Sequence, residues 1–411
     1  MQQREMPYEV LRAQQEQQLL TLIHRAHQRS PFYQRLYQSV DMNKIKSLDD
    51  LRRLPIITKQ QVRAHWNEIF IGQRWNKTVA HTSGTTGSPM RLYRDYQSIV
   101  EENAYLWAHR IAHGHEIGMR TVTLRGDLGR DKMELFDPFT NTLQLSSYNL
   151  RADRAEWYYQ TIQKFAPHAI LAYPSSMETL ANYLGQMGKT LDVPLVFTSS
   201  ESLYTHQRDK IEYAFNTRIS DWYGNAERTI ALEQRHDGSY DAFPLYSYNE
   251  YHEDHAITTG LINASFPLIR YRVDDVFVTA PASADGRTRV DAIKGRSNDF
   301  LVLPDGTRVG LLCCAFKGVD HLQYAQIVQE NTQHFTVNAV VEEKFSAEDE
   351  AHLRGNIVNR IGQTLPFDIC YVDESQIKRS QAGKFKLIHS TVAQSAAPTT
   401  CLSLLPTVYD Q

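Results

Sequence analysis

The sequence predicts an α/β fold, with a large N-terminal domain built on mixed and parallel sheets and a small C-terminal α+β domain. The chain has 411 residues, more than a single hydrophobic core usually serves, so two domains are expected. In the middle of the chain, short apolar runs alternate with helical patterns, which is typical of βαβ units. From about residue 257 the pattern changes to short strands separated by turns.

Two long helices are predicted in the first part of the chain. Leu19 and Ile23 recur at helical spacing among glutamines, which indicates an amphipathic helix through about Arg29. Asp95 is a favourable N-cap for a second helix, which Gly114 would end.

The central sheet is predicted from three short apolar runs. Residues 168–173, 194–198 and 218–222 have the composition of buried strands. Helical segments separate them, from 174 to 184 and around 208–215. This order implies parallel strands joined by helices.

A smaller unit is predicted after a boundary near residues 299–306. We therefore divide the chain into an N-terminal domain of residues 1–299 and a C-terminal domain of residues 300–411. The expected elements of the C-terminal domain are strands at 324–328, 336–341 and 369–372 and a helix near 351–361.

Composition narrows the class of protein. Hydrophobic residues make up 42% and charged residues 22%, which is ordinary for a globular chain. The formal net charge is −3 and no basic stripe occurs, so neither a nucleic-acid nor a membrane-surface partner is indicated. The polar N-terminus lacks an apolar signal-peptide core and no apolar run is long enough to span a membrane, so a cytoplasmic protein is expected.

A loop rich in hydroxyl groups and glycine is the most informative local feature. Its glycines allow close approach of the backbone to a ligand, and its hydroxyls and amides could donate to phosphate oxygens. It is not a Walker A loop, and on its residues alone a plain surface turn is equally plausible. The candidate phosphate-binding residues are Thr82, Ser83, Gly84, Thr85, Thr86 and Gly87.

This loop resembles the phosphate-binding signature of the adenylate-forming superfamily. Met90 and Arg91 follow it where many members have a lysine, which is typical of the phenylacetate–CoA ligase branch. The stretches 30–33 and 47–55 resemble the same branch, which also includes members from capsule and surface-polysaccharide biosynthesis. The family's fold is a large N-terminal domain followed by a small lid.

Four further segments resemble family motifs and occur in the family's order. Residues 221–227 resemble the Tyr-Gly-x-x-Glu segment, and residues 267–275 resemble the segment that ends in a ribose-binding aspartate. Residues 295–299 resemble the interdomain hinge, and residues 379–384 resemble the loop with the catalytic lysine. The resemblance thus covers the chain from about residue 30 to about residue 390.

The resemblance implies roles for residues that would bind the nucleotide. Tyr223 would pack on adenine beside Gly224, and Ser200 and Glu201 would frame the base through backbone contacts. Asp275 would accept hydrogen bonds from the ribose hydroxyls. From the residues alone, Tyr223 could equally be a core tyrosine, and Asp275 could form a salt bridge with the neighbouring Arg270 or Arg272.

Catalysis is assigned by the same resemblance to Lys384 and Glu227. Lys384 would stabilise the charge that develops between the incoming carboxylate and the α-phosphate, with Lys386 as its rival. Glu227 would help to hold Mg²⁺, although a solvated or helix-capping glutamate is the alternative. Arg296 would contact the nucleotide or fix the hinge.

The expected activity is that of an acid–thiol ligase. A small carboxylic acid, aryl or otherwise, would react with ATP and Mg²⁺ to give an acyl-AMP and pyrophosphate, and CoA would then accept the acyl group. Transfer to an amine or a carrier protein and a non-catalytic nucleotide-binding scaffold are the alternatives. Neither the acid nor the oligomeric state follows from the sequence, and a homodimer is left open.

One further cluster raises the question of a metal. His252 and His255 lie among acidic residues, but their spacing is not that of a His-Glu-x-x-His zinc motif. A solvated polar loop is the preferred interpretation, and a metal site there would need another ligand, for which His236 is a candidate.

Overall fold

The computed structural model describes most of the chain. The described residues are 6–73, 75–81, 90–126, 128, 132–147, 149–201, 203–281, 287–294, 301–305, 308–309, 315–316, 319–361, 365–373, 376–378 and 387–392.

A large mixed sheet forms the centre of the molecule. Among the described residues it has the strand order β14-β15-β10-β9-β8-β7-β6-β3-β5-β4, in which β5, β3, β6, β7 and β8 run parallel to one another. The parallel part and its edge strand are β3 (Thr121–Leu124), β4 (Glu134–Asp137), β5 (Thr142–Leu145), β6 (Ala169–Ala172), β7 (Leu195–Ser199) and β8 (Arg218–Gly224). The antiparallel part is β9 (Ala231–Gln234), β10 (Tyr240–Ala242), β14 (Val276–Thr279) and β15 (Val290–Lys294).

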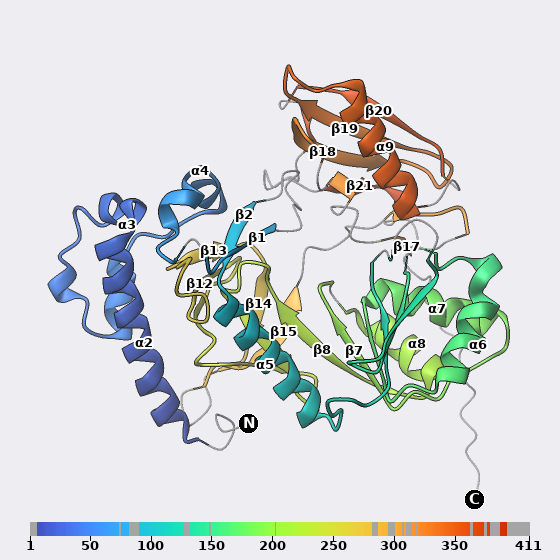
Figure 1. Ribbon diagram of the computed structural model, residues 1–411, viewed down its shortest axis with the longest axis horizontal. Helices are drawn as coiled ribbons and strands as arrows, with labels where there is room; N and C mark the ends of the chain where they lie inside the picture. Colours follow the sequence, from blue (N-terminus) through green and yellow to red (C-terminus); the bar gives the residue numbers. More distant parts are fainter. Residues whose placement is uncertain are drawn as a thin grey trace, which may run out of the picture.

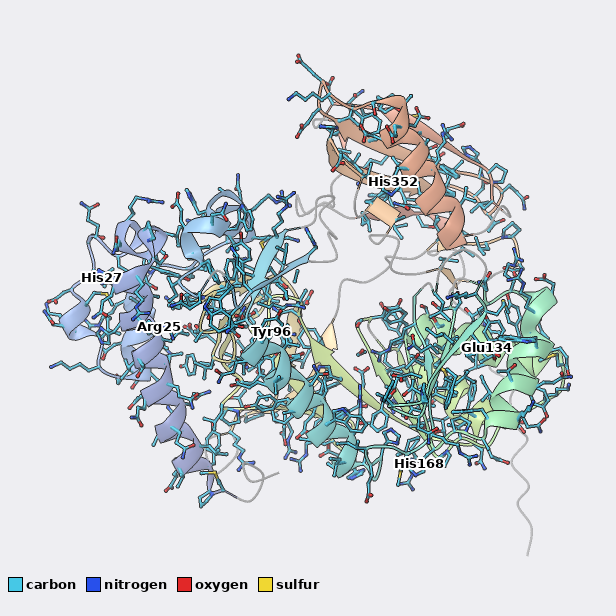
Figure 2. All side chains as sticks on the ribbon, viewed as in Figure 1. Arg25, His27, Tyr96, Glu134, His168 and His352 are labelled. Atoms are coloured by element: carbon cyan, nitrogen blue, oxygen red, sulfur yellow. The ribbon has the colours of Figure 1, made fainter. Side chains whose placement is uncertain are left out.

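Helices cover both faces of the parallel strands (Figure 1). On one face, α6 (Ala155–Phe165), α7 (Pro174–Gln186) and α8 (Thr205–Phe215) pack against inward-pointing residues such as Val196 and Ile219. Because side chains alternate along a strand, Phe197 and Ser220 point to the other face, where α5 (Tyr96–Ala112) lies. Tyr96, labelled in Figure 2, marks the start of α5.

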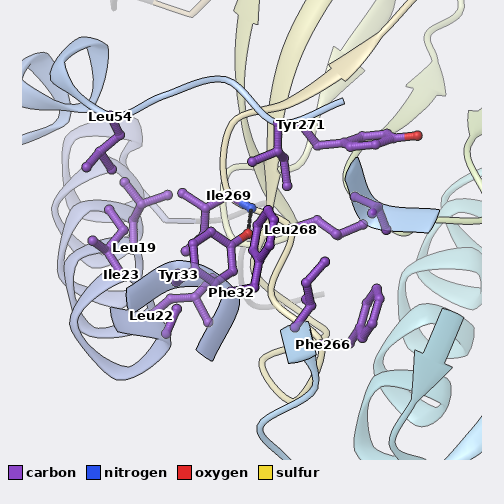
Figure 3. Packing of buried hydrophobic residues seen from close by; sticks show 14 of the residues in the cluster. Leu19, Leu22, Ile23, Phe32, Tyr33, Leu54, Phe266, Leu268, Ile269 and Tyr271 are labelled. Carbon is purple, nitrogen blue, oxygen red and sulfur yellow. Dashed lines mark hydrogen bonds between the residues drawn. The ribbon is translucent and has the colours of Figure 1, made fainter. Parts of the chain in front are cut away.

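The N-terminal helices pack against a second, smaller sheet (Figure 3). Tyr33 is fully buried there, donates a hydrogen bond to the carbonyl of Pro267 (2.9 Å) and accepts one from the amide of Ile269 (3.0 Å). The helices are α2 (Tyr8–Arg29), α3 (Pro31–Leu36), η1 (Met42–Lys44), η2 (Leu48–Arg53) and α4 (Lys59–Ile69). The sheet is β11 (Ser247–Tyr251), β12 (Ala256–Gly260) and β13 (Tyr271–Val273), and β1 (Thr78–His81) and β2 (Arg91–Arg94) pair separately.

The C-terminal part forms its own small sheet, drawn in orange in Figure 1, with the order β20-β19-β18-β21. Its core also includes Leu301 and Leu303, and Gln329 bonds both backbone groups of Val302. The elements are β16 (Leu301–Val302), β17 (Arg308–Val309), β18 (Leu322–Gln329), β19 (Phe335–Val341), α9 (Ala347–Ile361), β20 (Phe367–Tyr371) and β21 (Ile388–Ser390).

The predicted fold class is confirmed, because a large mixed sheet and a small C-terminal α+β unit are both present. The three predicted central strands are β6, β7 and β8, and they are parallel. Asp95 caps α5 by accepting a hydrogen bond from the amide of Ser98 (2.7 Å), as predicted. The division at residues 299 and 300 stays a prediction.

Candidate functional site

The candidate site lies where β7 and β8 end. Ser199 pairs with Trp222 across the two strands, so Ser200 and Tyr223, the next residues, are neighbours at the carboxyl edge of the sheet. Open parallel sheets bind ligands at this edge. Ser200 has a φ of +72°, an unusual conformation for a residue other than glycine. Tyr223 is half-buried and its ring meets Phe277 edge to face at 5.3 Å.

Two tyrosine–carboxylate hydrogen bonds join the segment 221–227 to the segment 267–275. The hydroxyl of Tyr223 donates to Asp275 Oδ2 at 2.6 Å, and the hydroxyl of Tyr271 donates to Glu227 Oε1 at 3.0 Å. In each segment, a tyrosine hydroxyl therefore donates a hydrogen bond to a carboxylate of the other segment. Three predicted site residues, Tyr223, Asp275 and Glu227, are brought together by these contacts.

The turn that carries Glu227 is fixed by its own residues. Asn225 accepts the amide of Thr229 at 2.9 Å and donates to the hydroxyl of Thr229 at 2.7 Å. Arg228 has a φ of +56°, and its carbonyl lies so close to Gly260 that an added Cβ there would meet it at 2.4 Å. Gly260 at the end of β12 thus supports the turn by close backbone contact.

Charged groups from β2 and α5 hold the same turn. Arg94 donates to the carbonyl of Ala226, and the buried Arg228 donates to the hydroxyl of Ser98 at 3.1 Å. Glu102 lies 3.9 Å from Arg228 and accepts a hydrogen bond from Tyr246. Burial raises the pKa of Glu102, although these partners favour its ionised form.

The segment that carries Asp275 is anchored by a buried ion pair. Arg270 binds both oxygens of Glu250 at 2.9 Å and donates to the carbonyl of Leu54 at 2.6 Å. Arg272 lies 2.9 Å from Asp274, the residue beside the candidate ribose ligand. The two arginines weighed as partners of Asp275 thus have other carboxylates as partners.

Glu201 contacts a helix through its side chain. Its two carboxylate oxygens accept hydrogen bonds from the amide of Ser175 (2.9 Å) and from the hydroxyl of Ser175 (3.0 Å) at the start of α7. A carboxylate is stabilised at a helix N-terminus, so this side chain fixes the loop after β7 to α7.

Part of the predicted site lies outside the described residues. The predictions for the catalytic Lys384 and for Arg296 concern residues there, as does the predicted phosphate loop: Thr82, Ser83, Gly84, Thr85, Thr86 and Gly87. The strands on either side of that loop are described, and they pair antiparallel with His81 opposite Arg91.

Glu227 fits the chemistry of a magnesium ligand. Tyr271 bonds one of its oxygens, and among the described residues no hydrogen bond is made by the other. Mg²⁺ prefers oxygen ligands and is commonly held by one or two carboxylates together with phosphate oxygens. The half-buried carboxylate is therefore suited to hold Mg²⁺ alongside a bound nucleotide.

The His252–His255 segment forms the turn between β11 and β12. The amide of His252 donates to the carbonyl of His255 (2.9 Å), the two rings stack at 4.6 Å, and His255 contacts Asp254. His236 lies elsewhere, with its ring 5.3 Å from that of His113. Within the described residues, no three His, Cys, Asp or Glu side chains are placed to hold a metal ion.

Sequence reasoning did not single out three residues that shape the site. Tyr271 lies inside the segment 267–275, which resembles a family motif, so the sequence offered a signal that could have identified it. Arg94 and Arg228 gave none, because their partners lie 132 and 130 residues away in the chain.

Comparison with known proteins supports the resemblance. The family model of the CapK C-terminal domain matches residues 301–391. Protein CapK of Staphylococcus aureus is 25% identical over 66% of this chain and 65% of its own length, just under two thirds of that protein. Phenylacetate–coenzyme A ligase of Thermus thermophilus is 28% identical over 72% of this chain and 73% of its own.

A solved structure shares the fold. The crystal structure of 2-hydroxyisobutyryl-CoA ligase with 2-HIB-AMP and CoA has a TM-score of 0.60, with 16% identity, and covers 95% of this chain and 92% of the ligase. The fold is therefore that of the adenylate-forming acid–CoA ligases. By sequence, the chain is similar to CapK and to the phenylacetate–coenzyme A ligases.

The described helices also bear on membrane association. Among them, none combines the length and the apolar character needed to cross a bilayer.

Proposed function

We propose that this chain activates a small carboxylic acid with ATP. The carboxylate oxygen attacks the α-phosphate, which forms an acyl-AMP and expels pyrophosphate. The thiol of CoA then attacks the acyl carbon, which forms a thioester and releases AMP. Phenylacetate–coenzyme A ligases among the relatives and the bound 2-HIB-AMP and CoA of the structural neighbour support this sequence of reactions.

The paired contacts Tyr223–Asp275 and Tyr271–Glu227 are the observation that carries the proposal. They bring a flat aromatic face, a carboxylate for a diol and a carboxylate for a cation to one edge of the sheet. A nucleoside triphosphate with Mg²⁺ needs these three kinds of contact at once. A core tyrosine or a surface ion pair would need only one of them.

Each residue would have a defined task. Tyr223 would present its ring to adenine, while its hydrogen bond to Asp275 holds the carboxylate toward the ribose. Each oxygen of an ionised carboxylate can accept more than one hydrogen bond, so the contact with Tyr223 is compatible with binding a diol. Glu227 would hold Mg²⁺, which neutralises charge on the phosphates, and Lys384 would stabilise the charge developing at the α-phosphate.

The acceptor is tested separately from the activation. Pyrophosphate release would be measured with Mg-ATP across aryl, short-chain and sugar-derived acids, with and without CoA. We expect one acid to release pyrophosphate, hydroxylamine to trap its acyl group, and CoA to increase turnover. Turnover that instead needs an amine or a carrier protein would keep the adenylation and replace CoA as the acceptor.

A nucleotide-binding scaffold is the alternative from another class. Its affinity for ATP would be the same with or without each of the acids, and it would release no pyrophosphate. That result, obtained across the whole panel, would contradict the proposed activation.

A further inference from the structure

Two arginines lie on the face of the sheet that α5 covers, and the proposed adenylation does not use them. Arg125 follows β3 directly, and Arg110 lies in the last turn of α5. Both side chains are half-buried. A charged group that is partly removed from water needs a partner if it is to be stable.

Arg125 lies at the carboxyl ends of three parallel strands. Its Nη2 donates to the hydroxyl of Ser199 at the end of β7 (3.1 Å), and its guanidinium lies 5.7 Å from the centre of the Tyr173 ring after β6. Its Nε is buried, and among the described residues it has no hydrogen-bond partner. One donor of this guanidinium therefore points into the protein without an acceptor.

Arg110 adds a second positive charge to the same region. Its guanidinium lies 5.0 Å from the centre of the Trp107 ring. Burial, and then repulsion from Arg125, lowers the pKa of Arg110 to about 10. Repulsion between two guanidinium groups is relieved when an anion binds between them.

The described carboxylates do not fill that role. Asp221 is the one that acts on Arg125 electrostatically, but its oxygens are bonded to Thr198 (2.5 Å) and Tyr240 (2.9 Å). Among the described residues, neither Arg110 nor Arg125 forms an ion pair. Arg110 also acts on the neighbouring His115, whose amide donates to the carbonyl of Arg110 at 3.0 Å. The region has excess positive charge.

This region adjoins the candidate nucleotide site. The hydroxyl of Ser199, which Arg125 binds, lies 3.3 Å from that of Ser200. Two strand spacings, about 10 Å, separate β3 from β7. An acid whose carboxylate is activated near the end of β8 could therefore extend along the strand ends and reach Arg125 with its far end.

We propose that Arg110 and Arg125 bind a second carboxylate of the substrate, so that the activated acid is a dicarboxylic acid. This inference rests on the proposed function, because it places the acid beside the nucleotide. Guanidinium groups bind carboxylates through two parallel hydrogen bonds, and such charge-assisted bonds are stronger than neutral ones. A monocarboxylic acid would leave both guanidinium groups unpaired and would be disfavoured.

The test compares acids that differ only in the second carboxylate. Glutarate is measured against pentanoate, homophthalate against phenylacetate, and glucarate against gluconate, by acid-dependent pyrophosphate release from the full chain. In at least one pair, we expect kcat/KM to be about 10- to 100-fold higher for the diacid.

Variants then locate the discrimination. Arg125→Met and Arg110→Met should each raise KM for the diacid about 10- to 100-fold with a smaller change in kcat, and Arg125→Lys should restore part of the loss. Arg218→Met is the matched control, because Arg218 is exposed at the opposite end of the strands. Thermal stabilisation by the diacid, present in wild type and absent in the Met variants, is a readout independent of turnover.

The outcomes separate the two proposals. Equal use of both acids in the pairs that react, or a diacid preference that survives both Met variants, would overturn the dicarboxylate inference and leave the activation in place. If ATP binds but none of the acids causes release of pyrophosphate, the proposed activation is overturned, and this inference with it.

Discussion

At the scale of single residues, the site depends on hydroxyl groups that hold carboxylates in place. Tyr271 and Tyr223 each donate to an acid on another segment, so Glu227 and Asp275 have their orientation before any nucleotide binds. Preorganised polar groups contribute most to transition-state stabilisation, because they need not reorganise during reaction. The two hydroxyls are therefore positioning groups. Removing one of them should weaken ligand binding by the carboxylate that it orients.

Removing the hydroxyl of Tyr271 tests this role. Tyr271→Phe should lower acid-dependent pyrophosphate release about 10-fold, since a hydrogen bond to a charged group contributes about 1.5–3 kcal/mol. The effect should shrink at high Mg²⁺ if the hydroxyl acts by orienting Glu227. Tyr213→Phe, on an exposed side chain, is the control and should change nothing. Activity of Tyr271→Phe equal to wild type at every Mg²⁺ concentration would contradict the role.

The two lysines of the C-terminal loop offer a matched pair. Lys384→Ala should reduce acyl-adenylate formation at least 100-fold, because a charge that develops in the transition state loses its counter-ion. Lys386→Ala should keep most of the activity. Rapid-quench measurement of acyl-AMP in both variants decides the assignment, and the reverse pattern would transfer the role to Lys386.

His115 should make stability depend on pH. Burial, then the charges of His168 and Arg110, lowers the pKa of His115 from 6.5 to about 4. The unfolded chain therefore takes up a proton first, and the free energy of unfolding should fall as pH decreases from about 6.5 to 4. His115→Gln should flatten that dependence in urea unfolding, and His24→Gln, on an exposed side chain, should not. An unchanged slope in His115→Gln would contradict the cause.

Sequence reasoning reached some of these residues and missed others. Tyr223, Asp275 and Glu227 were found because they lie in segments with a fixed order, and the structure brings them together. Their tyrosine–carboxylate partnerships were not predicted, because the partners are 52 and 44 residues apart and no local pattern links them. The capping contact of Glu201 on α7 was missed for the same reason.

At the scale of elements, the site depends on close packing between β12 and the Glu227 turn. Gly260 allows this packing, because a Cβ at that position would lie 2.4 Å from the carbonyl of Arg228. Arg228 itself is held by Ser98 and Glu102 of α5. The strand, the turn and the helix therefore form one unit around the candidate magnesium ligand.

Gly260→Ala tests that unit. The backbone must shift to remove the clash, so we expect a loss of about 2 kcal/mol in the free energy of unfolding and a larger relative loss of Mg-ATP binding. Gly355→Ala in α9 is the control, since nothing lies near its Cβ and alanine favours a helix by up to about 1 kcal/mol. A stable Gly260→Ala protein with normal Mg-ATP binding would contradict the packing argument.

The elements that were predicted share a local signal. α5 has a capping aspartate, and β6, β7 and β8 are apolar runs separated by helical segments, so their positions and parallel order follow from the sequence. The attachment of the N-terminal helices to the segment 267–275, through Tyr33 and Arg270, could not be predicted. It depends on contacts more than 200 residues apart, which no periodicity records.

At the scale of the whole molecule, the large sheet carries the candidate nucleotide site, and a small C-terminal unit follows it in the chain. Lys384 belongs to this second unit by sequence, so a complete site would need both parts of the chain. The boundary near residue 300 remains a prediction.

The central claim is that the chain forms an acyl-adenylate, and direct detection of that molecule tests it. The enzyme would be mixed with Mg-ATP and the preferred acid, without CoA, and quenched after a single turnover for mass spectrometry. The account predicts one equivalent of acyl-AMP and one of pyrophosphate, and neither product from Lys384→Ala at the same time. Pyrophosphate without acyl-AMP, or ADP and phosphate as products, would contradict it.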